Sequence, residues 1–325
     1  MAKRTLDSFF QSEARASKRA KFAVPNTTKS SHSTYPHDIL DTPADIKDEL
    51  THRVPKKPGR EINDQPHLDL VYFQPFIDKP VADRLFALLR YTLPFYRVQY
   101  TIRRAGVETT VNTPRFTTVF GVDSTSYFSP DERKILLDSS THRPVAPNKY
   151  KCTPPRPIPQ VLDFLRQRVE AVLGDGTTFN FCLVNYYASG DDSISYHSDD
   201  ERFLGPNPTI ASLSLGEQRD FLMKHKPDTA PRDRSLGKPL KLALSSGDMV
   251  VMRGETQSNW LHSIPKRSGK TAPGGRINIT FRKAIVPGGT ENYYRYNVGK
   301  GEMYRWDDDS GGMKVFEDPF RNARQ

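Results

Sequence analysis

Residues 276–282, with the sequence RINITFR, alternate strictly between polar and apolar side chains. Because neighbouring side chains on a β-strand point to opposite faces, the four polar residues would share one face and Ile277, Ile279 and Phe281 the other. An amphipathic strand with its polar face in water is the simplest interpretation. If that face instead lines the inside of a barrel, Arg276 and Arg282 need an anionic ligand. Arginine is well suited to bind a carboxylate through two hydrogen bonds.

The centre of the chain carries the pattern of a mainly β (α+β) fold. Two helices are expected, one opened by Asp78 and Pro80 and ending near Thr92, and one over residues 157–173, stopped by Gly174. Short strands separated by glycine and proline turns favour a double-stranded β-helix (jelly-roll) core with the helices packed outside it. Besides the segment above, the expected strands are residues 179–187, 194–199, 209–215, 220–224, 240–244 and 248–253.

Both ends of the chain differ from this central part. Residues 1–65 are rich in Ser, Thr, Pro, Lys and Asp and lack a sustained apolar period, so we expect a disordered tail there. Residues 66–286 are then the folded domain. The C-terminal extension, residues 287–325, combines several tyrosines with an acidic run at residues 307–309. Its glycines near residue 310 argue against regular structure, and we assign it no function.

Charge and composition restrict the partners and the compartment. The chain has 48 Lys and Arg against 38 Asp and Glu, a formal net charge of +10, which favours a polyanionic partner such as nucleic acid. Its two cysteines, Cys152 and Cys182, cannot build a disulfide framework and fit a reducing compartment. No apolar run approaches the roughly 18 residues of a membrane span, and the N-terminus lacks the apolar core of a signal peptide. We therefore expect neither a membrane protein nor a secreted one.

A short apolar cluster stands out in the N-terminal tail. Leu6, Phe9 and Phe10 would lie on one face of a single helical turn, as in peptides that dock by a helix in a groove. The cluster is similar to the PIP box that binds the replication sliding clamp, except that the pattern opens with Gln where this chain has Lys3. The alternative is an isolated apolar cluster without a partner. The basic residues of the tail, Lys3-Arg4 and the segment 18–21 (KRAK), resemble a nuclear localisation signal, so we expect a nuclear protein.

The segment His197-Ser198-Asp199 predicts a metal site. On a strand His197 and Asp199 point to the same side and can bind one ion together, and His262 is the best candidate for a third ligand. Two histidines and one carboxylate form the open triad of non-haem Fe(II) oxygenases, although zinc accepts the same ligands. A surface strand with two polar residues is the alternative without any metal. The two arginines of residues 276–282 favour iron, because a dicarboxylate co-substrate would offset the surplus positive charge.

In their order and spacing these motifs resemble the AlkB family of 2-oxoglutarate- and Fe(II)-dependent dioxygenases, in particular the eukaryotic branch that repairs alkylated nucleic acid. The resemblance covers about residues 68–286. It rests on Asn185-Tyr186-Tyr187, on segments 197–201 (HSDDE) and 210–216 (IASLSLG), on His262 and on residues 276–282. The cofactors that it implies are Fe(II), 2-oxoglutarate and O2.

The resemblance also implies a role for each matching residue. The metal would be held by His197, Asp199 and His262. Arg276 would bind the distal carboxylate of 2-oxoglutarate and Arg282 the carboxylate nearest the iron. The residues that would contact or support the co-substrate are, in full, Asn185, Tyr187, Arg276, Asn278, Thr280 and Arg282.

Substrate contacts are expected in front of the metal. In the family, the stretch after Pro114 forms a lid over an extruded base, so the resemblance assigns three substrate contacts: Arg115, Tyr127 and Glu201. Residues 98–112 predict a hairpin at the interface with nucleic acid. Two arginines at its tip, Arg103 and Arg104, suit phosphate contacts. An apolar residue of the hairpin, Ile102 or Val107, could fill the gap left by the extruded base.

The activity implied is oxidative demethylation of N-alkylated bases in DNA, of the 1-methyladenine and 3-methylcytosine type. The methyl group is hydroxylated and leaves as formaldehyde, while 2-oxoglutarate is converted to succinate and CO2. The base must leave the stack so that its methyl group can reach the metal. The alternatives are an RNA demethylase with the same chemistry, a protein hydroxylase, and a non-catalytic nucleic-acid-binding protein recruited by the clamp. We expect a monomer.

Overall fold

A computed structural model describes residues 23–52, 55–104, 106–146, 148–150, 153–229, 237–267, 274–298 and 301–316. The sliding-clamp cluster with Leu6, Phe9 and Phe10, the basic segments of the tail and Cys152 lie outside these residues. In the described part of the chain, none of the helices combines the length and the hydrophobicity needed to cross a membrane.

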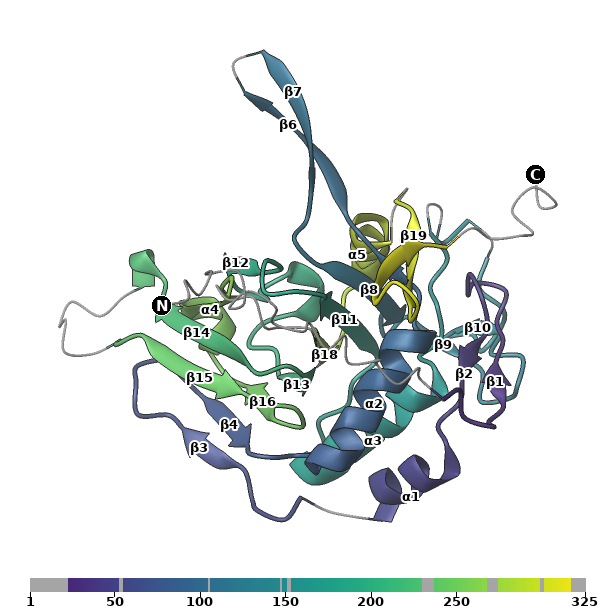
Figure 1. The fold of residues 1–325 in the computed structure, drawn as a ribbon, viewed down its shortest axis with the longest axis horizontal. Coiled ribbons are helices and arrows are strands. Elements are labelled where there is room, and N and C mark those ends of the chain that lie inside the picture. Colours follow the sequence, from purple (N-terminus) through teal and green to yellow (C-terminus); the bar gives the residue numbers. More distant parts are fainter. Residues whose placement is uncertain are drawn as a thin grey trace, which may run out of the picture.

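Two antiparallel sheets face each other and form the core (Figure 1). The smaller sheet has the order β12 (Ile194–His197), β17 (Trp260–Ile264), β14 (Arg219–His225), β15 (Leu240–Leu244). The larger sheet has the order β20 (Gly312–Val315), β19 (Met303–Asp307), β5 (Phe95–Tyr96), β8 (Phe116–Gly121), β11 (Phe181–Tyr187), β18 (Arg276–Arg282), β13 (Ile210–Gly216), β16 (Met249–Met252), β4 (Leu70–Phe73), β3 (Arg60–Ile62). The predicted mainly β, jelly-roll fold is confirmed.

Strand β18 lies in the middle of the larger sheet and all seven of its residues are buried. It pairs along its whole length with β11 on one side and over residues 276–281 with β13 on the other. Its apolar face, with Ile277, Ile279 and Phe281, packs in the main hydrophobic cluster. Its polar face therefore points toward the smaller sheet, away from bulk water.

Helices α2 (Lys79–Thr92) and α3 (Gln160–Leu173) cover the apolar face of the larger sheet, and α1 (Ala44–His52) packs against these two helices (Figure 1). Helix α2 begins after Asp78, as predicted, although the Asp78 side chain makes no capping hydrogen bond. Helix α3 begins three residues later than predicted. Ile158 precedes Pro159, and a residue before proline is pushed out of the helical conformation. Gly174 ends α3 with a φ of 63°, as predicted from the sequence.

The hairpin predicted over residues 98–112 is present. Strands β6 (Gln99–Arg104) and β7 (Val107–Asn112) pair in register, and the hairpin projects from the body of the molecule (Figure 1). Gly106 at its tip has a φ of 81°, which glycine adopts without strain. Its described side chains are mostly exposed, so the hairpin adds little to the core.

The structure differs from the expected disorder over residues 23–65. This segment forms α1, β3 and a small sheet of β1 (Lys29–Ser30) and β2 (Ile39–Leu40). Its apolar residues Tyr35, Ile39, Leu40, Ile46 and Leu50 are buried in the same cluster as α2 and α3. Ile46 and Leu50 are four residues apart and share one face of α1, but so short a pattern does not show that the segment packs against the folded core.

The C-terminal extension is also more regular than its glycines suggested. Residues 289–297 form α5 (Gly289–Asn297), and β19 and β20 form a hairpin that extends the larger sheet beside β5. Gly311 has a φ of 61° and Gly312 pairs with Asp307, so these glycines belong to the turn of the hairpin. Shorter elements are β9 (Ser126–Phe128), β10 (Leu136–Asp138), α4 (Thr256–Asn259) and two 3₁₀ turns, η2 (Arg202–Leu204) and η3 (Pro227–Thr229).

Candidate active site

The polar face of β18 lines a cavity of about 330 Å³ between the two sheets. All the predicted metal and co-substrate residues line this cavity, together with two of the predicted substrate residues. They are His197, Asp199, His262, Asn185, Tyr187, Arg276, Asn278, Thr280, Arg282, Arg115 and Glu201. The strand therefore has the inward polar face that its alternation allowed, and the interpretation of a solvent-facing strand is excluded.

Neighbouring strands of the smaller sheet place the two histidines side by side. His197 on β12 lies directly opposite His262 on β17, with ring centroids 4.2 Å apart. Asp199 follows two residues after His197, and its backbone N–H donates to Oε1 of Gln257 at 2.8 Å. Among the described residues, one group of three His, Cys, Asp or Glu side chains could hold a metal ion: His197, Asp199 and His262. Their ligand atoms all lie within 4.8 Å of one another.

The donor atoms of this group fit a divalent metal. The Nε2 atoms of His197 and His262 lie 3.9 and 4.0 Å from the Asp199 carboxylate oxygens. An ion with bonds of about 2.0–2.2 Å to nitrogen and oxygen can bridge such separations. Nδ1 of His197 faces the carbonyl of Ser195 at 2.8 Å, which leaves Nε2 for the metal. Burial lowers the pKa of His262 to about 3, so this ring is neutral and can act as a ligand.

At the Arg282 end of β18, the arginine side chain interacts with two carboxylates and a tyrosine hydroxyl. Nη2 of Arg282 lies 2.8 Å from Oδ2 of Asp199, and Nη1 donates to the Tyr293 hydroxyl at 2.8 Å. Glu201 lies 3.6 Å from the same guanidinium. Burial acts to raise the pKa of Asp199, but the pKa is lowered overall, most strongly by the charge of Arg282. Arg282 thus holds the candidate metal ligand Asp199 ionised and in place.

The Arg276 end of the same strand lacks an acidic partner. Arg276 is 1% exposed, and its Nη2 donates to Oγ of Ser214 at 2.8 Å. Its Nε and Nη1 atoms have no hydrogen-bond partner, and no carboxylate of the described residues forms an ion pair with it. Burial lowers the pKa of Arg276 to about 10. A buried guanidinium without an acidic partner can bind the carboxylate of an anion such as 2-oxoglutarate.

The other predicted co-substrate residues occupy the wall between these two arginines. Asn278 pairs in register with Asn185 on β11, and its side chain donates to Oγ of Ser212 at 2.8 Å. The Tyr187 ring lies 5.4 Å from the guanidinium of Arg276. Thr280 donates to the carbonyl of Leu183 at 3.2 Å. The structure brings these side chains together, and their roles toward 2-oxoglutarate stay predictions.

The substrate residues predicted from sequence divide into three groups. Nε of Arg115 donates to Oδ1 of Asn185 at 3.2 Å, and Glu201 keeps a buried Oε2 atom without a hydrogen-bond partner. Tyr127 lies elsewhere: it sits on β9, its hydroxyl contacts Nδ1 of His142 at 2.9 Å, and it is not among the cavity-lining residues. Arg103 is exposed on the projecting hairpin, whereas the side chains of Ile102 and Arg104 lie outside the description.

Several lining residues were not predicted from the sequence. The C-terminal helix α5 contributes Tyr293, Tyr296 and Asn297 to the cavity, and the smaller sheet contributes Phe221. The Phe221 ring lies 5.3 Å from that of His262. The tyrosine-rich segment was visible in the sequence, but nothing in it indicated which strand the helix packs against.

Comparisons with known proteins agree with this site. The sequence model of the 2OG-Fe(II) oxygenase superfamily matches residues 69–282. The chain is 33% identical over 244 residues to the DNA oxidative demethylase ALKBH2 of Arabidopsis thaliana, which covers 70% of each protein. It is 44% identical over 131 residues to ALKBH2 of Mus musculus, covering 40% of this chain and 53% of the mouse protein. It is 42% identical over 123 residues to the alpha-ketoglutarate-dependent dioxygenase alkB homolog 3 of Homo sapiens, covering 38% and 42%.

The matched region contains the whole of β18 together with the two histidines and Asp199. The chain spans about half the length of the mouse relative and somewhat less of the human one. It covers more than two thirds of the Arabidopsis relative. By these matches the chain belongs to the 2OG-Fe(II) oxygenase superfamily and, within it, to the AlkB family, whose cofactors are Fe(II), 2-oxoglutarate and O2.

Proposed function

We propose that this protein is an oxidative demethylase that repairs N-alkylated bases in DNA, of the 1-methyladenine and 3-methylcytosine type. The observation that carries the proposal is a single cavity with a candidate metal triad at one end and the unpaired, buried Arg276 at the other. A metal site alone fits many reactions. A metal site together with an unsatisfied cation in the same cavity fits a dicarboxylate co-substrate bound beside the metal.

In this proposal His197, Asp199 and His262 hold Fe(II). Bound together, Fe(II), 2-oxoglutarate and O2 supply an oxidising reaction in which one oxygen atom goes to succinate, with loss of CO2, and the other is inserted into a C–H bond of the N-methyl group. Arg276 binds the distal carboxylate through Nε and Nη1, which have no other partner. Arg282 keeps Asp199 ionised and oriented. The buried walls of the cavity exclude bulk water from the reacting group.

Glu201, at the cavity, supports an alkylated base as the substrate. An N-methylated adenine or cytosine of this type is planar and cationic. Oε2 of Glu201 is a buried acceptor without a partner and lines the same cavity. Burial raises the pKa of Glu201, and the neighbouring charge of Arg282 offsets only part of that effect. A cationic base that donates to Glu201 would satisfy this oxygen and favour its ionised form.

The hairpin and the net charge support a nucleic-acid partner. The hairpin carries the exposed Arg103 and Val107, the latter 64% exposed, far out from the body of the molecule (Figure 1). A basic residue there can contact phosphate, and an apolar one can fill the gap left by an extruded base. The ALKBH2 relatives are named DNA oxidative demethylases, which favours DNA over RNA as the substrate of this chain.

The test measures formaldehyde and repaired base after incubation of the protein with a 3-methylcytosine oligonucleotide, Fe(II) and 2-oxoglutarate. Reactions without 2-oxoglutarate are the control, and single-stranded DNA, duplex DNA and single-stranded RNA are compared. Repair that requires 2-oxoglutarate and is faster on DNA is expected. Faster repair of RNA would make the protein an RNA demethylase. Succinate formation without repair of any of the three would refute the proposed substrate.

We further propose that the protein works as a monomer in the nucleus and is recruited to the sliding clamp by Leu6, Phe9 and Phe10. The proposal rests on the sequence of the tail. Deletion of residues 1–12 should abolish binding to the clamp and leave repair of free oligonucleotides unchanged. Unchanged clamp affinity after the deletion would refute it, and alanine at Lys3 alone should change the affinity little.

A further inference from the structure

The C-terminal helix α5 adds a wall to the active-site cavity from outside the region that matches the oxygenase family. The family match ends at residue 282, and α5 spans Gly289–Asn297. Tyr293, Tyr296 and Asn297 line the cavity. They are spaced i, i+3 and i+4, so they share one face of the helix. The oxygenase site of this protein is thus completed by a segment that the family motifs do not include.

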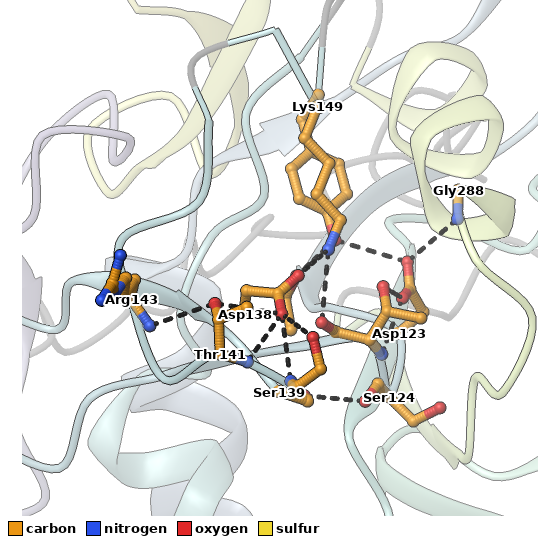
Figure 2. Close-up of polar contacts among 12 residues, drawn as sticks. Asp123, Ser124, Asp138, Ser139, Thr141, Arg143, Lys149 and Gly288 are labelled. Atoms are coloured by element: carbon orange, nitrogen blue, oxygen red, sulfur yellow. Dashed lines mark hydrogen bonds and ion pairs between the residues drawn. The ribbon is translucent and has the colours of Figure 1, made fainter.

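Hydrogen bonds fix the start and the end of α5 on the larger sheet. The Asp123 carboxylate accepts from the backbone N–H of Gly288 at 3.3 Å and from the Thr290 hydroxyl at 3.4 Å; Figure 2 shows Asp123 beside Gly288. Near the other end, Thr117 on β8 donates to the carbonyl of Asn297 at 3.0 Å. The helix is therefore held in place before any substrate binds.

The middle of α5 is tied both to the core and to the active site. The Tyr294 hydroxyl donates to the carbonyl of Gly121 at 2.8 Å and accepts from the N–H of Arg156 at 2.9 Å. The hydroxyl of the adjacent residue, Tyr293, accepts from Arg282 at 2.8 Å. Through Arg282 the helix reaches Asp199, so its position is set by the same network that orients the candidate metal ligand.

Tyr296 differs from the other aromatic residues around the cavity. Tyr187 and Phe221 are buried, and the hydroxyl of Tyr293 is already bonded to Arg282. Tyr296 is 53% exposed although it lines the cavity, so it lies at the cavity mouth with much of its surface free. Of the described aromatic residues that line the cavity, excluding the histidines, it is the one with a large surface left for a ligand to cover.

We propose that the Tyr296 ring stacks on the extruded alkylated base and determines how tightly the base is held. This inference rests on the proposed function. A planar cationic base gains both stacking and cation–π energy on the face of a tyrosine. The base would then lie between Tyr296 at the mouth and the unsatisfied Glu201 oxygen deeper in the cavity.

The test compares binding of two oligonucleotides that differ only at the target position, one with 3-methylcytosine and one with an abasic analogue. Binding is measured by anisotropy with 2-oxoglutarate and Mn(II) in place of Fe(II), so that no turnover occurs. The ratio of the two affinities gives the contribution of the alkylated base to the free energy of binding. Tyr296→Ala should lower this ratio about tenfold, or about 1.4 kcal/mol. Tyr296→Phe should keep it within about twofold, because stacking needs the ring and not the hydroxyl.

Arg295→Ala is the matched control, because Arg295 is the exposed neighbour on the same helix and does not line the cavity. Loss of a phosphate contact there would weaken both oligonucleotides equally and leave the ratio unchanged. An unchanged ratio for Tyr296→Ala, with a clear preference in the wild type, would overturn the inference. A wild-type protein without any preference for the alkylated base would overturn it too.

Kinetics separate this inference from the proposed function. With Fe(II), Tyr296→Ala should raise the KM for the oligonucleotide about tenfold with little change in kcat, since stacking is lost equally from bound substrate and transition state. A base preference that depends on Tyr296, without any repair by the wild type, would support the stacking site and refute the demethylase.

Discussion

The two ends of β18 carry the same residue in opposite electrostatic situations. Arg276 and Arg282 are 1% and 2% exposed, and both point into the cavity. Arg282 meets Asp199, Glu201 and Tyr293; burial acts to lower the pKa of Arg282, but these three partners together raise it. Arg276 meets the Ser214 hydroxyl and the Tyr187 side chain but no carboxylate of the described residues, and burial lowers its pKa. One arginine is therefore part of the protein's own charge balance, while the other is left for a ligand.

The contrast between the two arginines indicates where an anionic ligand can bind. A buried charge without a partner is unfavourable by several kcal/mol in proteins. A fold tolerates it where function requires it and where binding supplies the missing charge. The Arg282 end should respond to mutation mainly through stability and metal binding, and the Arg276 end mainly through affinity for 2-oxoglutarate.

The largest effect is expected at the metal end. His197→Ala removes one of three ligands, so turnover of 2-oxoglutarate should fall to the level seen without metal. Co(II) absorption titration should show weaker metal binding, with co-substrate consumption measured in parallel. His67→Ala is the control, because His67 is an exposed histidine that contacts Glu255 and does not line the cavity. If His197→Ala bound the metal as tightly as the wild type, His197 would not be a metal ligand.

Arg282→Met should lower the free energy of unfolding by about 3–5 kcal/mol, because it leaves Asp199 buried without its partner. Urea unfolding of the metal-free protein measures the change. Replacing Asp199 by Asn in the same variant should restore part of the lost stability, since no buried charge then remains. Equal unfolding midpoints for wild type and Arg282→Met would show that Asp199 does not depend on this partner.

Arg276→Met should leave the metal-free protein as stable as the wild type or more stable, because it removes an unpaired buried cation. Its affinity for 2-oxoglutarate should fall at least about 30-fold, or about 2 kcal/mol. Calorimetric titration with 2-oxoglutarate and thermal unfolding with and without it test both statements. Arg276→Lys should lie in between, because lysine keeps the charge but cannot bind a carboxylate through a rigid fork. A loss of stability equal to that of Arg282→Met would contradict the contrast between the two ends.

The smallest effect is expected on the hairpin, where charges are exposed and screened. Arg103→Ala should weaken DNA binding slightly and reduce the slope of log affinity against log salt concentration by about 1. Titrations at several salt concentrations measure the slope. Arg133→Ala, an exposed arginine outside the hairpin, is the control. If the salt dependence of DNA affinity had the same slope in Arg103→Ala and the wild type, Arg103 would not contact a phosphate.

Sequence patterns were most informative where burial and periodicity coincide. The alternation of residues 276–282 predicted an inward polar face, and the register of β18 with β11 and β13 puts that face into the cavity. The spacing of His197 and Asp199 predicted a shared ligand site, and the pairing of His197 with His262 brings the third side chain to it. In both cases a period of two residues translates directly into position on a sheet.

The sequence was least informative where long-range packing decides. Residues 23–65 have few apolar side chains, and their order comes from burial of Ile39, Leu40, Ile46 and Leu50 against the core. Tyr127 matched the expected position of a lid residue, yet β9 pairs with β10 and carries it to His142. Such placements depend on which elements meet in space, and no local pattern encodes that.

By itself, then, the sequence predicted the mainly β class, the polar strand, a shared site for His197 and Asp199 and, if that strand faces inward, the need for an anion, because each follows from local period and charge. The tertiary structure decided three further points. It showed which of the two arginines lacks a carboxylate partner among the described residues, that α5 contributes to the wall of the cavity, and that Tyr296 lines the cavity whereas Tyr127 does not. These points depend on contacts between segments that are far apart in the chain. Which groups surround a buried charge is decided only when the fold brings those segments together.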